Sequence, residues 1–207
     1  MTGNGHFDMQ EVRLECDGLT TRDFSLPPFR VRTDQGLCLH VRLPTAIWYE
    51  TLKPMLSGRI AHPSLHVYGS VSYLERPMPR RRWWGWLYSP SAGEWLAADR
   101  GLTSSEAEAV LNLVGEPADM SIGRIGWKER TLFALEAILL RPPDLLVFDA
   151  CGNDRETIYR IFDRLASRTP QFALLYLKTR LEREDPCLPG AVCLEVLHAR
   201  APATIAE

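Results

Sequence analysis

The chain of 207 residues is long enough for one domain, or for one domain that carries a subdomain, with a buried core. Its 45% hydrophobic residues, 24% charged residues and net charge of −2 are ordinary for a globular protein and indicate no general nucleic-acid-binding surface. The five cysteines have no CxxC spacing, so we expect reduced thiols and neither a disulfide framework nor a zinc site. The start, MTGNGHFDMQ, has no signal-peptide pattern, and no apolar run approaches the roughly 20 residues that span a bilayer.

The first third of the chain alternates between apolar and polar residues, which predicts β-strands. Turn-forming residues separate the runs, so we expect an antiparallel layer with strands near residues 12–16 and 29–33 that leads to a strand over 37–43. A short helix over 50–56 then ends at Ser57 and Gly58, and strands follow over 66–68 and 70–74.

The middle of the chain changes in composition. Residues 77–101 are rich in Arg, Trp, Pro and Gly and lose regular periodicity. Thr103 and Glu106 form a capping-box pattern, which predicts a helix that ends at Gly115. A second helix is expected over 128–140, before Pro142 and Pro143.

The last third favours a parallel sheet. The apolar run over 144–149 is typical of a buried parallel strand, and a helix over 155–167 and strands over 172–177 and 191–197 follow it. Strand, helix and strand with short connections indicate an α/β sheet that is covered by helices.

Residues 125–149, IGWKERTLFALEAILLRPPDLLVFD, resemble the signature helix and the Walker B strand of ATP-binding cassette (ABC) ATPases. Other landmarks fall in the family's order: a first strand over 12–16, the Walker A loop over 43–51, the strand into the Q-loop over 71–76, a subdomain helix over 102–115 and the strand into the switch loop over 174–180. The resemblance implies one ABC-ATPase-like domain over 1–207, with an antiparallel β-layer, a parallel core and a helical subdomain over 77–128.

A phosphate-binding loop needs glycines, so that backbone amides reach the phosphates, together with a lysine and a hydroxyl for magnesium. Aligned with the family's Walker A motif, this chain has Leu43 and Trp48 at glycine positions, Tyr49 at the lysine and Glu50 at the first hydroxyl. Only Thr51 is retained. Bulky side chains and a carboxylate would obstruct and repel a triphosphate.

The other ATPase positions also depart from the family's pattern. The resemblance places Asp149 at Walker B, but a helix cap at the end of the strand is an alternative role for this residue. The remaining correspondences are Ala150 for the catalytic glutamate, Gly126, Trp127 and Lys128 in the signature, Thr179 for the switch histidine and Arg76 for the Q-loop glutamine.

These replacements predict a chain without catalytic residues, bound cofactor or ATP. In this family two subunits share each ATP site, so pairing with an intact cassette would still leave both composite sites incomplete. Histidines offer no substitute chemistry: His62 and His66 are four residues apart, but Pro63 interrupts any helix, so we expect no metal site.

The tract after the Q-loop position suggests a partner surface. In the family this region borders the groove that receives the coupling helices of a transmembrane subunit, and arginine and aromatic residues are enriched at interface hot spots. We therefore assign a partner or membrane interface to Arg80, Arg81, Arg82, Trp83, Trp84 and Trp86. Direct contact with anionic lipid headgroups and a buried role for the tryptophans are the alternatives.

The sequence thus predicts an inactive, pseudo-ATPase cassette that serves as a structural or regulatory subunit of a membrane-associated complex. Its expected partners are a transmembrane subunit and a second cassette, identical or ATP-competent, with no nucleic acid. The expected location is the cytoplasm, peripheral to the inner membrane through these partners. A divergent but active ATPase and a soluble scaffold without a membrane subunit are the other hypotheses.

Overall fold

The computed structural model describes residues 12–33, 36–41, 43, 47–78, 80–81, 87–149, 153–167, 172–179 and 192–198. Contacts between Cα atoms divide the chain into two units. The first contains Met1–Ser72, Pro143–Asp149 and Thr169–Glu207, and the second contains Tyr73–Pro142 and Ala150–Arg168. Neither unit is one continuous segment of the chain.

The first unit contains an antiparallel sheet in the order β4-β1-β6, formed by β1 (Val12–Cys16), β4 (Phe29–Arg32) and β6 (Leu65–Val67). Every second side chain of β1 and β4 is buried, including Leu14, Cys16, Phe29 and Val31. This pattern follows from the two-residue period of a strand that covers a core with one face. The predicted antiparallel layer is confirmed.

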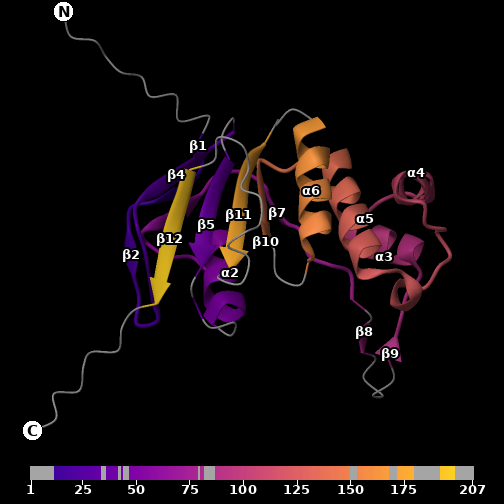
Figure 1. The fold of residues 1–207 in the computed structure, drawn as a ribbon, viewed down its shortest axis with the longest axis horizontal. Coiled ribbons are helices and arrows are strands. Elements are labelled where there is room, and N and C mark those ends of the chain that lie inside the picture. Colours follow the sequence, from indigo (N-terminus) through magenta and orange to yellow (C-terminus); the bar gives the residue numbers. More distant parts are fainter. Residues whose placement is uncertain are drawn as a thin grey trace, which may run out of the picture. The chain divides into compact units, whose positions relative to one another are not determined.

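A seven-stranded sheet has the order β2-β3-β12-β5-β11-β10-β7 (Figure 1). Its strands are β2 (Leu19–Thr20), β3 (Phe24–Leu26), β5 (Gly36–Val41), β7 (Val71–Tyr73), β10 (Leu145–Asp149), β11 (Ala173–Thr179) and β12 (Val192–His198). Within this sheet the strands β12, β5, β11 and β10 run parallel to one another, and β3 pairs antiparallel with β12. Leu145 to Phe148 are fully buried, as expected of a parallel strand with both faces covered.

The second unit is mainly helical. Its elements are a hairpin of β8 (Arg80–Arg81) and β9 (Leu87–Tyr88), the helices α3 (Ala92–Arg100), α4 (Ser104–Val114), α5 (Trp127–Leu140) and α6 (Arg155–Ser167), and the 3-10 turn η2 (Ile122–Arg124). The aromatic rings of Trp95 and Phe133 meet edge to face, with centroids 5.7 Å apart. This pair joins α3 to the buried helix α5.

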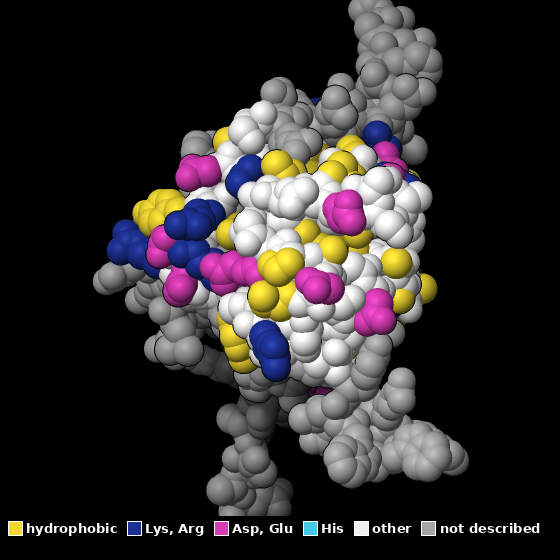
Figure 2. All heavy atoms as spheres, turned by 90° about the vertical axis from the view of Figure 1, so that its right-hand side faces the viewer, with side chains coloured by type: hydrophobic (Ala, Val, Ile, Leu, Met, Phe, Trp, Pro, Cys, Tyr) yellow, Lys and Arg dark blue, Asp and Glu magenta, His cyan; other side chains and the backbone are white. Residues whose placement is uncertain are grey.

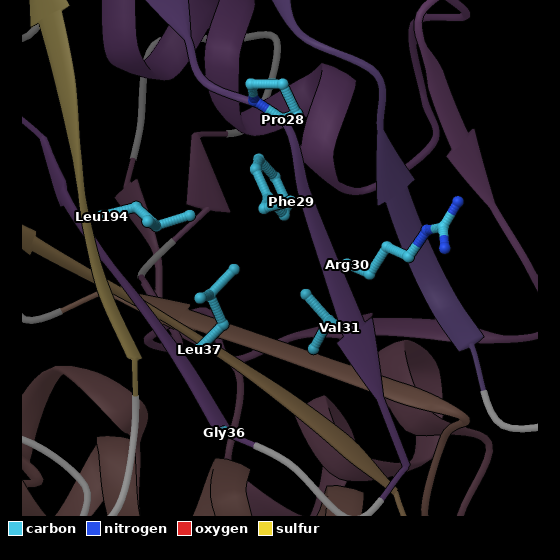
Figure 3. Close-up of a pocket in the computed structure, with 7 residues that line it drawn as sticks. All are labelled: Pro28, Phe29, Arg30, Val31, Gly36, Leu37 and Leu194. Atoms are coloured by element: carbon cyan, nitrogen blue, oxygen red, sulfur yellow. The ribbon is translucent and has the colours of Figure 1, made fainter.

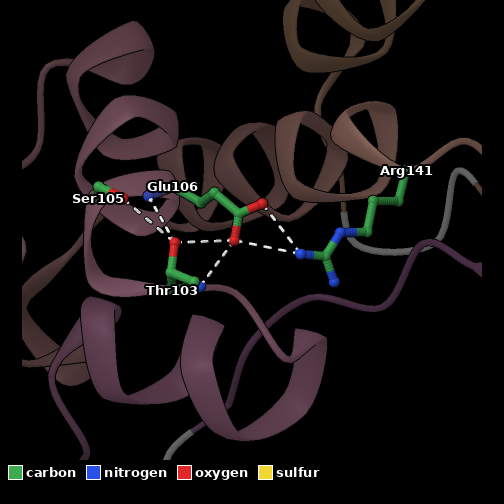
Figure 4. A network of polar contacts seen from close by, with 4 residues as sticks. All are labelled: Thr103, Ser105, Glu106 and Arg141. Atoms are coloured by element: carbon green, nitrogen blue, oxygen red, sulfur yellow. Dashed lines mark hydrogen bonds and ion pairs between the residues drawn. The ribbon is translucent and has the colours of Figure 1, made fainter.

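Most predicted elements are confirmed, and their bounds differ by one to a few residues. The predicted helix over 128–140 is α5, that over 155–167 is α6, and the capping box of Thr103 and Glu106 is present at the start of α4 (Figure 4). The predicted subdomain, residues 77–128, lies within the range of the second unit. The unit is larger than predicted, because it contains the whole of α5 and of α6.

Three features differ from the prediction. Residues 92–100 form helix α3, although the sequence analysis found no periodicity there. The short strands β2 and β3 are additional, and the predicted helix over 50–56 begins earlier, with a π-helical turn, η1 (Trp48–Leu52), ahead of α2 (Lys53–Leu56). Among the described helices, none is long and apolar enough to cross a bilayer.

Candidate functional site

The carboxyl ends of β5, β11 and β10 meet at one edge of the seven-stranded sheet, all within the first unit. Thr179 is in register with Val41, and Asp149 is in register with Leu177. Because β11 lies between them, β5 and β10 are about 10 Å apart at the usual strand spacing. The structure therefore brings the Walker A, Walker B and switch positions to the same edge, where α/β sheets bind their ligands.

The segment after β5 contains the residues that the sequence resemblance assigns to Walker A. Leu43 is half-buried, Glu50 is exposed and Thr51 is half-buried in η1, while Leu52 is fully buried. Only the backbone of Trp48 and Tyr49 is described. Glu50 is in the first turn of η1, where the positive end of a helix favours an anion such as its carboxylate.

The helix that follows β5 is irregular as well as acidic. Pro54 is in the first turn of α2 and has no amide proton to donate. The preceding turn, Trp48–Leu52, is π-helical, and α2 has only four residues. Phosphate binding at a helix start depends on regularly spaced free amides, and this local geometry does not favour such an array.

Asp149 ends β10 and is partly exposed. The helix-capping role that the sequence offered for this residue is filled by Asp154, whose Oδ1 accepts a hydrogen bond of 2.7 Å from the Thr157 amide. That hydrogen bond is the main cause that lowers the pKa of Asp154. Ala150 lies outside the described residues.

A row of ionisable residues that was not predicted from the sequence crosses three neighbouring strands of the sheet. Lys178 of β11 is in register with His40 of β5, and His40 is in register with Glu195 of β12. Lys178 is only 6% exposed. The available signal was an ionisable residue within each largely apolar strand, next to the last residue in β5 and β11 and in the middle of β12, but strand order cannot be read from that pattern.

In the second unit, the Q-loop and signature positions touch. The guanidinium carbon of Arg76 lies 4.4 Å from the centroid of the Trp127 ring, and Arg76 Nη2 donates to Asn153 Oδ1 over 3.0 Å. Arg76 Nε also donates to Thr131 Oγ1 over 3.4 Å. No sequence signal identified Thr131 or Asn153, because contacts between such distant segments follow only from the fold.

The other signature positions have local partners. Lys128 forms an ion pair of 2.6 Å with Glu156 of α6, and its hydrogen bond is the first cause that lowers the pKa of Glu156. A Cβ atom on Gly126 would collide with the Glu129 carboxylate. The start of α5, which the sequence resemblance assigns to the signature, thus carries a large exposed ring at Trp127, a cation at Lys128 and a carboxylate from Glu129 that covers Gly126.

Of the proposed partner tract, the structure describes only the backbone of Arg80 and Arg81. Arg80 and Arg81 form β8, while Arg82, Trp83, Trp84 and Trp86 lie outside the described residues. The assignment of this tract to an interface therefore stays a prediction. On the molecular face drawn in Figure 2, basic and acidic side chains are interspersed beside hydrophobic ones.

A cavity of about 210 Å³ lies in the first unit, away from the Walker A edge. Figure 3 shows Phe29, Val31, Leu37 and Leu194 around it, while the side chain of Arg30 points away. Gly36 and Leu37 belong to the amino-terminal end of β5, the end opposite the candidate edge. The apolar lining of this cavity does not fit a phosphate group.

His62 and His66 each have a local role. The Ser64 amide donates to His62 Nδ1 over 3.1 Å, and His66 lies in β6 with its Nε2 3.8 Å from an Asp17 carboxylate oxygen. The two histidines therefore do not form a pair on one helix face.

No protein-family model matches the chain, and neither does any curated protein. Solved structures do match. A putative metal-chelate type ABC transporter in an inward-facing conformation aligns with a TM-score of 0.62 and 13% identity, over 82% of this chain and 73% of that one. A putative ABC transporter ATP-binding protein from Pyrococcus furiosus gives 0.60 and 14%, over 89% and 96%.

The fold is that of an ABC cassette. It combines the predicted antiparallel β-layer, parallel core and helices, so the predicted fold class is confirmed. An archaeal ribosome recycling factor, solved in complex with the ribosomal stalk protein aP1, also aligns, with a TM-score of 0.52 and 15% identity over 86% of this chain and 36% of that one. The cassette fold alone therefore does not distinguish a transporter subunit from other kinds of cassette protein.

Proposed function

We propose that this chain is a cassette that does not hydrolyse ATP and serves as a structural or regulatory subunit of a membrane-associated, ABC transporter-like complex. The observation that carries the proposal is the acidic, π-helical turn with Glu50 that follows β5, in the segment that the sequence resemblance assigns to the phosphate loop. The other departures, at Ala150, Trp127, Lys128 and Thr179, point the same way. Several independent positions would have to change before ATP chemistry became possible.

The membrane partner is inferred from similarity of fold and from composition. Two of the similar structures described above are ABC transporter components by name. The arginine and tryptophan tract over 80–86 has the composition of an interface hot spot. We accordingly place the chain in the cytoplasm, at the inner membrane, bound to a transmembrane subunit and to a second cassette.

Nucleotide binding to the full chain tests the loss of ATP chemistry. We expect no heat in a titration with Mg²⁺-ATP and no change in melting temperature. A ligand at one hundred times its Kd would stabilise the fold by about 2.7 kcal/mol, which is a shift of about 5–10 °C for a chain of this size. Magnesium-dependent binding with turnover, weakened by Asp149→Asn, would instead support the divergent ATPase.

Co-fractionation with membranes tests the partner tract. We expect the chain to fractionate with membrane proteins. This co-fractionation should be lost when Arg80, Arg81 and Arg82 are changed to alanine. Changing the same three residues to lysine is the matched control, because lysine keeps the charge and loses the guanidinium fork. Binding that survives in the lysine variant indicates headgroup attraction, and binding lost in both indicates specific protein contacts. If the unaltered chain never associates with membranes, the soluble scaffold is the better hypothesis.

A further inference from the structure

Three segments of the second unit meet at Arg76. This residue follows β7, and its guanidinium contacts Trp127 at the start of α5 and Asn153 just before α6. The Thr131 hydroxyl, in the next turn of α5, is 3.1 Å from both Asn153 Oδ1 and the Trp127 carbonyl oxygen and can donate its single proton to either. One arginine therefore takes part in a network that ties both helix starts together.

The network around Arg76 is partly shielded from solvent. Thr131 is only 2% exposed, and Arg76 is half-buried. Arg76 also lies near the buried Arg130. Burial is the first cause that lowers the pKa of Arg130, and the positive charge of Arg76 is the second. Placing Arg76 beside a like charge is unfavourable, so the ring face of Trp127 and the acceptor on Asn153 must offset that repulsion.

The same segments are fixed by contacts on either side of Arg76. Arg130 donates from Nε to the Ile125 carbonyl oxygen over 2.8 Å, which holds the segment before α5. The ion pair of Lys128 with Glu156 joins α5 to the first turn of α6. Trp127 nevertheless remains 56% exposed, so its indole ring is both anchored and accessible.

We propose that Arg76 is an intrachain clasp that holds the starts of α5 and α6 in one arrangement without a bound nucleotide. The proposal deepens the proposed function, because these are the positions that the sequence resemblance assigned to the Q-loop, the signature and the segment after Walker B. In a cassette without ATP chemistry, these contacts keep the two helix starts in the same arrangement at all times.

Hydrogen exchange of the full chain, followed by mass spectrometry, tests the clasp. Arg76→Gln removes the charge and the fork, and we expect about tenfold faster amide exchange in residues 127–131 and 155–158, with α4 unchanged as an internal reference. Arg76→Lys keeps the charge without the planar fork and should give an intermediate effect. Arg124→Gln changes an exposed arginine nearby and is the matched control.

A second variant keeps the test valid if Arg76→Gln does not fold. Asn153→Ala removes the acceptor that Arg76 and Thr131 share, and it should accelerate exchange in the same two segments. Unchanged exchange in the folded variants overturns the clasp.

Added Mg²⁺-ATP separates the clasp from the proposed function. We expect no effect on the exchange of residues 127–131 and 155–158. Slower exchange there on addition of ATP would overturn the proposal that the arrangement is independent of nucleotide. Protection confined to residues 47–56 would contradict the loss of ATP binding and leave the clasp intact.

Discussion

At the scale of single residues, Asp144 organises the start of the buried parallel strand β10. Its Oδ2 accepts hydrogen bonds from the Ser70 amide, 2.8 Å away, and from the Ser70 hydroxyl, 2.9 Å away, and Arg13 forms an ion pair with its Oδ1 at 3.3 Å. The Ser70 bonds are the first causes that lower the pKa of Asp144. Gly69 has a positive φ of 82°, and a Cβ atom there would collide with the Asp144 carboxylate. Glycine is therefore required at position 69 for two reasons.

Asp144→Asn keeps the shape of this side chain but removes its charge. We expect the free energy of unfolding at pH 7 to fall by about 1 kcal/mol, less than for a fully buried carboxylate because the side chain is 37% exposed. The folded pKa is lowered, so the charge contributes its full stability above the ordinary aspartate pKa of about 3.9 and loses it as the pH falls through the lowered value.

Urea unfolding at pH 7 and below about pH 3 measures this difference. The difference in the free energy of unfolding between Asp144→Asn and the unaltered chain should disappear at the lower pH. Asp119→Asn, at an exposed position in the turn before η2, is the control and should show no such closing gap. A gap of equal size at both pH values would mean that the carboxylate charge is not the source of the stability.

At the scale of elements, helix caps fix where the helices of the second unit begin. The Thr103 hydroxyl accepts from the Glu106 amide over 3.3 Å, the Glu106 carboxylate accepts from the Thr103 amide over 2.7 Å, and Arg141 pairs with the same carboxylate (Figure 4). Arg141 is the C-cap residue of α5. The carboxylate of Glu106 thus joins the start of one helix to the end of another.

Thr103→Ala should destabilise the protein by about 1 kcal/mol, because the Glu106 amide loses its partner at the first turn of α4. For a chain of this size, that is a fall in melting temperature of about 2–4 °C. Ser104→Ala, one residue later and exposed, is the matched control and should have a smaller effect. Equal shifts for the two variants would show that the cap contributes nothing beyond helix propensity.

Caps and strand alternation explain which elements were predictable. Thr103 and Gly115 marked α4 in the sequence, and the apolar run over 144–149 marked β10. Helix α3 was missed although Ser91 and Glu94 form a capping box and Gly101 ends the helix, because its apolar residues do not follow a strong helical period. The Arg76 network could not be foreseen, since it joins three segments that only the tertiary fold brings together.

At the scale of the whole chain, the first unit is completed by its last described strand. β12 lies between β5, which is parallel to it, and β3, which is antiparallel to it, so residues 37–41 pair with 192–196 and residues 24–25 pair with 197–198. Such distant pairing makes sheet completion a late event, because the cost of closing a long loop must be met first. Val196, fully buried in β12, shows that the strand also fills the core.

A chain that ends at residue 191 should not fold into a stable monomer. Without β12, both β5 and β3 present unpaired backbone edges, which promote association between chains. We expect large aggregates in size-exclusion chromatography and no cooperative thermal transition. Val196→Ala is the matched control, because it keeps the strand and leaves only a small cavity, so the variant should remain monomeric with a loss of about 2 kcal/mol. A truncated chain that eluted as a monomer and melted cooperatively would show that the parallel core forms without its final strand.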